Sequence, residues 1–522
     1  MSEESSFDVV VVGMGPVGAA MACLLGRYGL RVCVIEKSTL VYPAPRAIAL
    51  DNEALRILQL VGLPEGSFET ISIPEVNMHS PFFGRFNRID TTGAIDGHPK
   101  LVTFFQPQLE EKLRSKVKNF PTVSVRMGWE LQAFENQPEK VLVDVRSPEG
   151  EQRRLSARYL VGADGATSTV RRLLGLDFQG ETYPEDWLVV DVKNAPRPID
   201  HVEFICNPQR PAPHMPAPGN RQRWEFKLQP GETREEMEKP EVIQKLLVPW
   251  DPHQQCEIER VAVYRFHARV ADAFSKGRTF LVGDAAHITP PFVGQGLVAG
   301  LRDVGNLAWK LAWVCNGLAG EQILQTYDLD RRPHAVAMIE VAKLMGKLVM
   351  PRNKPLAVFS HGLVRTLRFI PRLRRYLEKA EIKPPHAFPA GAVVPGGSPC
   401  GLVRGGLFPQ AWLRRDRHDG AFLLSDEALQ GKLALVGLGV NPQSTLSENL
   451  ARAWLQRGGT FVTIQPRGRF VEGSYEDVTA ELVGNRIPLG HVAVVRPDNA
   501  LLHDGPCARV DDIVREALSI LG

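Results

Sequence analysis

A glycine pattern near the start of the chain constrains the fold of the first domain more than any other feature. A β-branched apolar run at residues 7–12 leads into Gly13-x-Gly15-x-x-Gly18, and apolar residues at helical spacing follow at residues 19–25. A second apolar run ends at Glu36, 18 residues after the third glycine. This order of strand, turn, helix, strand and acid is typical of a βαβ unit that binds a dinucleotide, whereas an ordinary packing turn lacks that context.

The chemistry of the turn explains why glycine is needed there. Without side chains in the way, backbone amides can approach a pyrophosphate at the helix N-terminus, where the helix dipole favours negative charge. Glu36 is positioned to accept hydrogen bonds from ribose hydroxyls. The residues predicted to hold the cofactor in this unit are Gly13, Met14, Gly15, Pro16, Val17, Gly18, Glu36 and Lys37.

A second loop rich in glycine and proline follows the apolar strand at residues 280–282. It contains Gly283-Asp284-Ala285-Ala286-His287, then Pro290-Pro291, then Gly294-Gln295-Gly296. An aspartate just past a strand is often only a helix cap, but two prolines and three glycines within residues 283–296 predict a rigid loop that approaches a flat, polar group. Asp284 suits a sugar-alcohol hydroxyl better than a metal, because no partner ligands cluster nearby in the sequence.

A third motif, Gly162-Ala163-Asp164-Gly165-Ala166-x-Ser168-x-Val170-Arg171, completes a set that resembles the group A flavoprotein aromatic monooxygenases over about residues 7–345. The resemblance implies bound FAD, with Arg46 and Gln106 joining the glycine turn, Asp284 on the ribitol and the loop at residues 294–298 against the flavin ring. It also implies that Asp164 and Arg171 are structural and position the cofactor rather than acting as acid or base. The further cofactor contacts that it implies are Gly283, Gly294, Gly296, Leu297 and Val298.

Finer matches narrow the subgroup. Residues 185–192, 223–232 and 300–303 look like the corresponding stretches of the 3-(3-hydroxyphenyl)propionate hydroxylases. The chain departs from that pattern at Val298, where most relatives have asparagine, and at Asp330, where glutamate is usual. The backbone amide of Val298 remains, so flavin binding is still expected, while the identity of the substrate is left open.

The hydrophobic periodicity divides the chain into domains. Period-2 alternation and proline-rich turns at residues 187–267 predict an antiparallel sheet inserted into an α/β domain. We expect a discontinuous FAD-binding domain at 1–72, 101–186 and 268–345, and a substrate-binding domain at 73–100 and 187–267. A helical connector and linker at 346–399 leads to residues 400–522, whose strand and helix order is typical of a thioredoxin-like domain. The expected fold class is α/β: a Rossmann-like domain with an inserted antiparallel sheet and a C-terminal thioredoxin-like domain.

The cysteines give no sign of a redox centre. Seven of them are scattered singly, with no C-x-x-C and no spacing typical of metal ligands, so we predict no metal site and a reducing, cytoplasmic location. Disulfide exchange needs two nearby thiols, and Cys400 and Cys507 lie far apart in the sequence. We therefore expect a structural or oligomerising role for the C-terminal domain, and a homodimer is left open.

The charge balance limits the partners. The chain has 62 lysines and arginines and 59 aspartates and glutamates, so its net charge is 62 − 59 = +3. This small charge predicts no broad basic face for nucleic acid. The apolar run near the start follows an acidic leader, carries three glycines and reaches Arg27 too soon for a membrane span. We expect neither secretion nor stable membrane association, and a small ligand rather than a macromolecule.

The resemblance implies an oxidoreductase that uses FAD, O₂ and NADH or NADPH to hydroxylate a small phenol ortho to its hydroxyl, through a flavin C4a-hydroperoxide. No second Gly-x-Gly-x-x-Gly occurs, so the nicotinamide is expected to bind transiently. Pro290 and Pro291 suit the wall beside the reacting flavin carbon, and His214 is the candidate base for the phenol proton. The inserted sheet is expected to form a roof over the substrate. Its candidate substrate contacts are Arg223, Trp224 and His267, for each of which a packing or surface role is the ordinary alternative.

Other functions stay open at this point. The same scaffold could hydroxylate a larger polyketide-type or heteroaromatic phenol, or act as a flavin dehydrogenase or oxidase that never inserts oxygen. The double proline and the Gly294-Gln295-Gly296 loop argue against the dehydrogenase or oxidase. A redox-responsive binding module would need a reactive cysteine pair that the sequence lacks.

Overall fold

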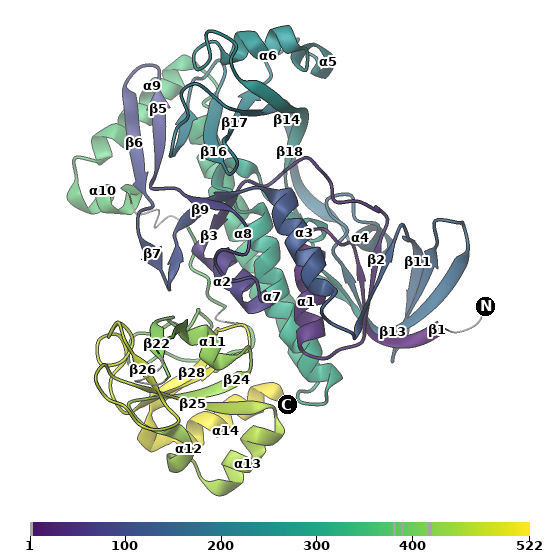
Figure 1. Cartoon of the computed structure of the whole chain (residues 1–522), viewed down its shortest axis with the longest axis vertical. Coiled ribbons are helices and arrows are strands. Elements are labelled where there is room, and N and C mark those ends of the chain that lie inside the picture. Colours follow the sequence, from purple (N-terminus) through teal and green to yellow (C-terminus); the bar gives the residue numbers. More distant parts are fainter. Residues whose placement is uncertain (1–3, 379–382, 389, 416–419) are drawn as a thin grey trace.

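The computed structural model describes residues 4–378, 383–388, 390–415 and 420–522 (Figure 1). The strands of its first sheet are β1 (Glu4–Val12), β2 (Val32–Glu36), β10 (Val123–Met127), β11 (Glu130–Asn136), β12 (Val141–Arg146), β13 (Gln152–Gly162), β19 (Ser275–Lys276) and β20 (Thr279–Leu281). The order is β10-β2-β1-β13-β12-β11, and β20 pairs with β13 and with β19. The strands β10, β2, β1, β13 and β20 are parallel, and β11 and β12 form an antiparallel extension.

The helices around this sheet include those that the glycine pattern predicts. They are α1 (Pro16–Arg27), α2 (Asn52–Val61), α3 (Gln106–Val117), α4 (Thr169–Leu173), α7 (Gly296–Cys315) and α8 (Gln322–Val349). Gly15 is the N-cap residue of α1, and Pro16 occupies the first helical turn, where a missing N–H costs nothing. The α1 helix contacts both α3 and α7. Residues 9–11 of β1 are fully buried against this layer.

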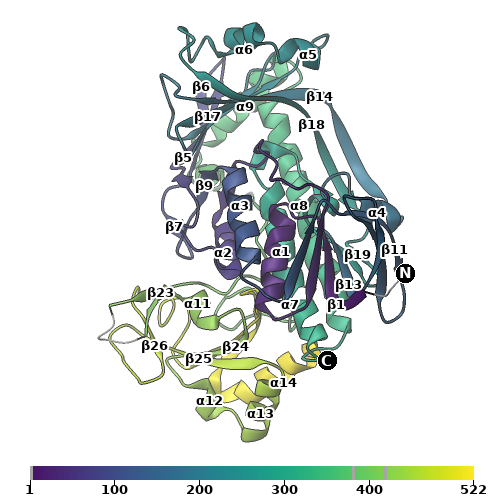
Figure 2. The same ribbon diagram turned by 45° about the vertical axis from the view of Figure 1, so that its right-hand side comes forward.

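A second large sheet lies above the first (Figure 2). Its strands are β5 (Glu75–Ser80), β6 (Gly84–Asp90), β14 (Phe178–Lys193), β15 (Val202–Ile205), β16 (Ala212–Ala217), β17 (Arg221–Lys227), β18 (Glu257–Ala271) and β21 (His287–Ile288). The order is β21-β18-β14-β17-β16-β15-β5-β6, and all neighbours are antiparallel except β15 and β5. The long antiparallel pair β14 and β18 joins this sheet to the first sheet and its helices (Figure 2).

The remaining helices and strands of this half of the chain flank the two large sheets. The helices α5 (Arg234–Met237) and α6 (Pro240–Leu247) lie at the top of the molecule, where Met237, Ile243 and Leu247 pack on the second sheet (Figure 1). The other short strands and helices are β3 (Ala49–Asp51), β4 (Thr70–Ser72), β7 (Ala94–Ile95), β8 (His98–Pro99), β9 (Leu101–Phe104), η1 (Gly283–Ala285), η2 (Pro291–Val293), α9 (Lys354–Leu367) and α10 (Pro371–Glu378).

The C-terminal domain has its own mixed sheet of order β23-β22-β26-β25-β24-β27-β28. The strands are β22 (Trp412–Arg414), β23 (Phe422–Leu424), β24 (Leu433–Leu438), β25 (Gly459–Gln465), β26 (Tyr475–Asp477), β27 (His491–Val495) and β28 (Leu501–Pro506). The helices are α11 (Ser425–Leu429), α12 (Pro442–Thr445), α13 (Glu448–Gln456), η3 (Cys507–Arg509) and α14 (Val510–Leu521). The predicted α/β fold class, with its inserted sheet and C-terminal domain, is confirmed.

Buried ion pairs fasten the C-terminal domain to the first sheet and its helices. Arg56 of α2 donates to Asp426 of α11 at 2.7 Å, and both side chains are almost fully buried. Arg496, just after β27, lies 3.5 Å from Asp330 of α8, which also accepts from Lys310 of α7 at 2.8 Å. Because buried charges are tolerated only when paired, these contacts define how the two domains dock. Over the described part of the chain, no helix has the length and apolar character needed to cross a bilayer.

Candidate flavin and substrate site

A large cavity of about 940 Å³ lies where the first domain, the second sheet and the C-terminal domain meet. The glycine turn, the loop around Arg46 and the loop at residues 288–297 line one end of it. The second sheet and α8 line the other end, and residues 383–386 with Leu407 and Arg486 close the outer side. A volume near the top of the usual range of about 300–1,000 Å³ for ligand sites suits a large ligand together with a smaller one.

The glycine turn leaves space at one of its three glycines. A Cβ atom on Gly13, which has a φ of +102°, would lie 2.3 Å from the carbonyl oxygen of Ala163, and a Cβ on Gly18 would lie 2.0 Å from that of Gly13. A Cβ on Gly15 would meet no atom within 4 Å, and Gly15 lines the cavity together with Pro16 and Val17. Gly13 and Gly18 therefore allow close packing, while Gly15 keeps the N-terminus of α1 open to an anion such as a pyrophosphate.

The Glu36 carboxylate accepts hydrogen bonds from two backbone N–H groups, one of them in the glycine turn. Its Oε2 accepts a hydrogen bond from the backbone N–H of Met14 at 2.6 Å, and its Oε1 accepts from that of Ser38 at 2.8 Å. Neither Glu36 nor the exposed Lys37 is among the residues that line the cavity. The contact of Glu36 with a ribose stays a prediction, and its visible role is to hold the turn.

The loop that carries Arg46 is held from two sides. Gln106 accepts hydrogen bonds from the backbone N–H groups of Arg46 and Ala47 at 2.9 and 2.8 Å, and both Arg46 and Gln106 line the cavity. On the other side, the buried Arg223 donates to the carbonyl oxygens of Pro45 and Arg46 at 2.9 and 3.1 Å. Arg223 thus supports the loop and does not itself line the cavity.

Asp284 presents an unpartnered carboxylate to the cavity. It lies at the end of β20, and within the described parts of the chain no group donates a hydrogen bond to it. Burial raises the pKa of this carboxyl, and the nearby His287 and Arg46 partly oppose that shift. A half-buried acceptor without a donor fits a ligand that brings its own hydroxyl groups.

The loop around Asp284 is fixed by a buried ion network beneath it. Nε2 of His287 lies 2.7 Å from Oδ2 of Asp303, which also accepts from the backbone N–H of Gly283 at 2.9 Å. Arg331 donates to the second oxygen of Asp303 at 2.8 Å. His287 and Asp303 are fully buried, so they position the loop rather than touch a ligand in the cavity.

The proline and glycine loop forms one wall of the cavity. Pro291 lines it, whereas Pro290 is buried behind the wall. Gly294 has a φ of +64°, a conformation that glycine adopts without strain, and it lines the cavity. Val298 is fully buried in α7 and is not part of the lining. The other lining residues of this loop are Phe292, Val293, Gln295, Gly296 and Leu297.

The Asp164 motif supports the cofactor end without lining it. Asp164 accepts hydrogen bonds from the hydroxyl of Ser168 and the backbone N–H of Thr169 at 2.5 and 2.7 Å, and so orders the start of α4. Arg171 donates to the carbonyl oxygen of Ala285 at 2.9 Å and thereby ties this motif to the Asp284 loop. Ala163 and Gly165 are the members of the motif that line the cavity.

The end of the cavity beneath the second sheet is mainly apolar. Its lining includes Met78, Phe204, Met215, Phe292, Met345 and Leu348. Glu225 of β17 also lines it, and burial raises the pKa of this carboxyl. Glu225 lies in the stretch at residues 223–232 that resembles the hydroxylase subgroup, but the sequence gave no signal that its side chain faces the cavity.

None of the four residues predicted for the substrate site lines the cavity: His214, Trp224 and His267 lie elsewhere, as does Arg223, which supports the Arg46 loop. In the pairing of β16 and β17, His214 lies opposite Trp224, on the face that packs against Trp250. His214 is fully buried, and its ring nitrogens lie 2.9 Å from Glu203 and 2.9 Å from Gln222. His267 lies 3.0 Å from Thr182 on β14, away from the lining residues. The structure therefore does not bring the candidate base His214 to the substrate, because successive strand residues face opposite sides of a sheet.

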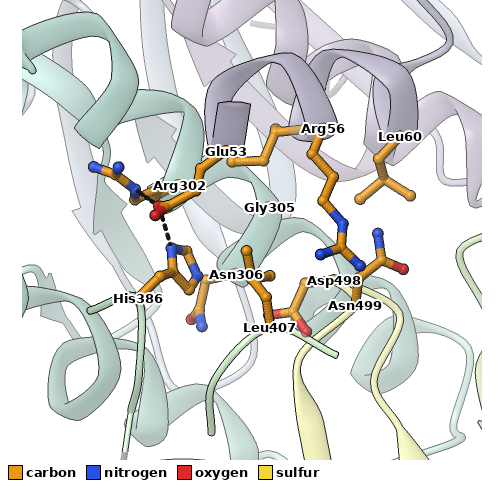
Figure 3. A pocket seen from close by; sticks show the side chains of 11 residues that line it. Glu53, Arg56, Leu60, Arg302, Gly305, Asn306, His386, Leu407, Asp498 and Asn499 are labelled. Carbon is orange, nitrogen blue, oxygen red and sulfur yellow. Dashed lines mark hydrogen bonds and ion pairs between the residues drawn. The ribbon is translucent and has the colours of Figure 1, made fainter. Parts of the chain in front are cut away.

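A charged network that the sequence analysis did not single out joins the cavity to the C-terminal domain. Arg302 of α7 donates to Gln295 at 2.9 Å, to Asp51 at 2.9 Å and to Glu53 at 2.6 Å. Glu53 also lies 3.1 Å from His386 in the linker (Figure 3). Beside them is a second cavity of about 20 Å³, room for about one water, between α2, α7 and the C-terminal domain. Arg302 lies in the motif at residues 300–303, but no sequence signal indicated that His386 in the linker would join the same network.

The comparisons with known proteins agree with this geometry. A family model described as an FAD binding domain matches residues 6–342, and one described as the HcaD C-terminal domain matches residues 405–519. The residues present fit FAD, because Gly15 leaves the helix N-terminus open and Asp284 offers a carboxylate without a partner.

Curated relatives cover nearly the whole chain. A 3-(3-hydroxy-phenyl)propionate/3-hydroxycinnamic acid hydroxylase of Burkholderia cenocepacia (strain HI2424) is 37% identical over 94% of this chain and 92% of its own. The protein of the same name from Mycolicibacterium smegmatis (strain ATCC 700084 / mc(2)155) is 33% identical over 100% of this chain and 94% of its own.

Solved structures share the fold. The flavin-dependent monooxygenase PieE, solved with FAD and substrate, has a TM-score of 0.81 at 22% identity and covers 100% of both chains. The anhydrotetracycline hydroxylase OxyS from Streptomyces rimosus has a TM-score of 0.77 at 24% identity and covers 99% of both chains. With the family model over residues 6–342 and relatives above 30% identity, the chain belongs to the FAD-dependent aromatic monooxygenases, in the subgroup of the 3-(3-hydroxyphenyl)propionate hydroxylases.

Proposed function

We propose that this protein uses FAD, O₂ and NADH or NADPH to hydroxylate a small phenolic acid, similar to 3-(3-hydroxyphenyl)propionate, ortho to its hydroxyl. The observation that carries the proposal is the single cavity that runs from Gly15 and Asp284 to an apolar chamber beneath the second sheet. One end suits a pyrophosphate and sugar hydroxyls, and the other suits an aromatic ring.

Bound FAD would supply the redox chemistry, which is hydride acceptance from a nicotinamide and activation of O₂. The chain's own part is to bind, to orient and to exclude water. Gly15 and the N-terminus of α1 would hold the pyrophosphate, Asp284 would accept from a ribitol hydroxyl, and the loop at residues 291–297 would bind the ring system. Phe292, Met345 and Leu348 keep water away from the reacting atoms.

We propose Glu225 as the group that accepts the phenol proton, in place of His214. Glu225 is buried and lines the chamber. It lies on β17, the same strand as Arg223, which supports the Arg46 loop. Its raised pKa brings a carboxylate closer to the strength needed for a general base. The variant Glu225→Gln should keep FAD and lose most turnover, and the acidic limb of the kcat profile should disappear. An unchanged profile in a flavin-loaded variant would exclude Glu225 as the base.

Lys100 is our candidate for binding the carboxylate of the substrate. It lines the cavity, and no acidic side chain of the described residues forms an ion pair with its ammonium. Two other lining cations are already engaged, since Lys383 lies 2.6 Å from Asp51 and Arg486 lies 3.8 Å from Asp96. The variant Lys100→Met should raise KM for a phenolic acid and leave KM for the matching neutral phenol unchanged.

A screen of phenols with the purified, flavin-loaded protein tests the function. Phenylpropionates, cinnamates and larger polycyclic phenols are compared for stimulation of NADH and NADPH consumption, and the products are identified by mass and regiochemistry. A hydroxylated product from a phenolic acid supports the proposal. The size of the cavity keeps a larger polyketide-type phenol as the second candidate, and a product from those substrates alone would favour it. Dehydrogenation, or H₂O₂ formation with no oxygenated product from any phenol, would refute hydroxylation.

A further inference from the structure

Three side chains of the C-terminal domain bring a sulfur, a nitrogen and an oxygen atom together. Cys400 precedes the first strand of the domain, His491 begins β27, and Asp504 lies in β28. Sγ of Cys400 is 3.6 Å from Nε2 of His491 and 3.6 Å from Oδ2 of Asp504, and Nε2 is 3.0 Å from Oδ2. His491 and Asp504 are buried, and Cys400 is half-buried. These residues are 91 and 13 positions apart, so the sequence showed no metal-ligand spacing.

The geometry distinguishes this cluster from a nucleophilic relay. In a relay of the Ser-His-Asp type, the nucleophile and the carboxylate occupy opposite nitrogens of the imidazole ring. Here the thiol and the carboxylate both face Nε2 of His491. All three atoms therefore converge on one point, which is the arrangement that a bound cation needs.

The separations match those of zinc ligands. With bonds of about 2.3 Å to sulfur and about 2.0–2.1 Å to nitrogen and oxygen, tetrahedral angles place the ligand atoms about 3.3–3.6 Å apart. The sulfur separations of 3.6 Å already meet this value. Only the 3.0 Å gap between His491 and Asp504 has to widen, by about 0.3 Å, a movement within side-chain rotation.

The surroundings of Asp504 prepare it as a ligand. Arg404 donates to its other oxygen, Oδ1, at 3.0 Å and so turns Oδ2 toward His491 and Cys400. Oδ2 also accepts a hydrogen bond from the Ser398 hydroxyl, which has to be released when Oδ2 binds an ion. The charge of Arg404 opposes a cation, so we expect weaker binding than at a four-ligand structural zinc site.

A cavity reaches the Cys400 side of the cluster. Cys400 lines a space of about 230 Å³, which offers room for a water molecule as fourth ligand. Pro385, His386, Leu407 and Arg486 line both this space and the main cavity. The cluster thus lies beside the wall that the linker and the C-terminal domain contribute to the substrate chamber.

We propose that Cys400, His491 and Asp504 bind one Zn²⁺ ion, with water as the fourth ligand, and that the ion fastens the segment around Cys400 to β27 and β28. Binding releases the thiol proton to solvent and requires a neutral His491 with its Nε2 lone pair facing the ion. The role is structural and separate from the hydroxylation. The competing explanation is a hydrogen-bonded cluster in which Asp504 accepts from Ser398, Cys400 and His491 without a metal.

The test uses the flavin-loaded protein after treatment with a chelator. The chain is titrated with Zn²⁺, and bound metal is counted after gel filtration in the wild type, Cys400→Ser, Asp504→Asn and Cys507→Ser. Cys507→Ser is the matched control, because Cys507 is a half-buried thiol of the same domain whose sulfur hydrogen-bonds to the Thr445 hydroxyl and lies outside the cluster. Flavin content and the melting temperature in chelator show that each variant is folded.

The proposal expects one Zn²⁺ per chain in the wild type and in Cys507→Ser, and at least a tenfold weaker affinity in the other two variants. Zinc should raise the melting temperature only where it binds. It should also slow alkylation of Cys400 while leaving alkylation of Cys507 unchanged, which provides a control within one molecule. Equal zinc binding in the wild type and Cys400→Ser, or no effect of zinc on Cys400 alkylation, would overturn the proposal and favour the hydrogen-bonded cluster.

Discussion

Replacing Gly15 with valine should remove FAD and leave the fold intact. The φ of Gly15 is −66°, which any residue can adopt, and a Cβ there meets no protein atom within 4 Å. The cost to folding is therefore expected to stay below about 1 kcal/mol. The valine side chain instead extends into the part of the cavity beside the N-terminus of α1, where the pyrophosphate is expected to bind.

The expected loss of affinity follows from the hydrogen bonds that valine would block. A hydrogen bond to a charged group contributes about 1.5–3 kcal/mol. If two backbone N–H groups can no longer reach the pyrophosphate, binding weakens by about 3–6 kcal/mol, which is roughly two to four orders of magnitude in Kd. The variant should therefore be isolated largely without flavin.

The assay compares the ratio of flavin to protein absorbance after purification, the FAD affinity of the flavin-free protein and its melting temperature. Gly397→Val is the matched control, since a Cβ on this exposed linker glycine also meets no atom within 4 Å. Gly13→Val is the contrasting case. Its side chain would collide with the Ala163 carbonyl, so it should lower stability as well as flavin content. A Gly15→Val protein with full flavin occupancy would refute the position of the pyrophosphate.

Three further predictions concern other parts of the molecule. Asp284→Ala should weaken flavin retention and raise the ratio of H₂O₂ to product. Because burial raises the pKa of Asp284, its carboxylate increasingly destabilises the flavin-free wild type as pH rises above about 4. The flavin-free variant should therefore melt higher than the flavin-free wild type at pH 7, and this difference should disappear toward pH 4. Arg56→Ala leaves Asp426 buried without its partner and should lower the free energy of unfolding in urea by about 3–5 kcal/mol. The control Arg31→Ala, at the exposed pair with Asp8, should lower it by no more than about 1 kcal/mol. Equal effects would contradict the docking role of Arg56. The double variant Cys400→Ser with Cys507→Ser should keep coupled hydroxylation with or without a thiol reductant, since neither cysteine forms a disulfide; a collapse of turnover at unchanged flavin content would show a redox role.

The parts of the molecule that were predictable from sequence depend on local patterns. The turn at residues 13–18 is one, because glycine spacing, an apolar strand and a following helix all lie within one short segment. The order of strands and helices after residue 400 is another, since each element carries its own periodicity. Such features need no knowledge of distant contacts.

The orientation of the substrate strands was not predictable in this way. Alternation shows that Trp224 faces one side and that Arg223 and Glu225 face the other, but it does not show which side meets the cavity. That choice depends on packing against α6 and on the Arg46 loop, which come from distant parts of the chain. His214 was therefore named as a candidate base although its side chain lies on the face away from the cavity, and the cluster at Cys400 had no sequence signal because its members lie on separate elements.

The position of the C-terminal domain determines the order in which the walls of this cavity are synthesised. The lining residues of the glycine turn, the Arg46 loop and the Asp284 loop all precede α7, whereas Leu407 and Arg486 of the outer wall are translated far later. A growing chain thus completes its cofactor-binding surface before the side of the chamber exists. The C-terminal domain therefore adds part of the boundary between the chamber and the surrounding water after the cofactor-binding surface is complete.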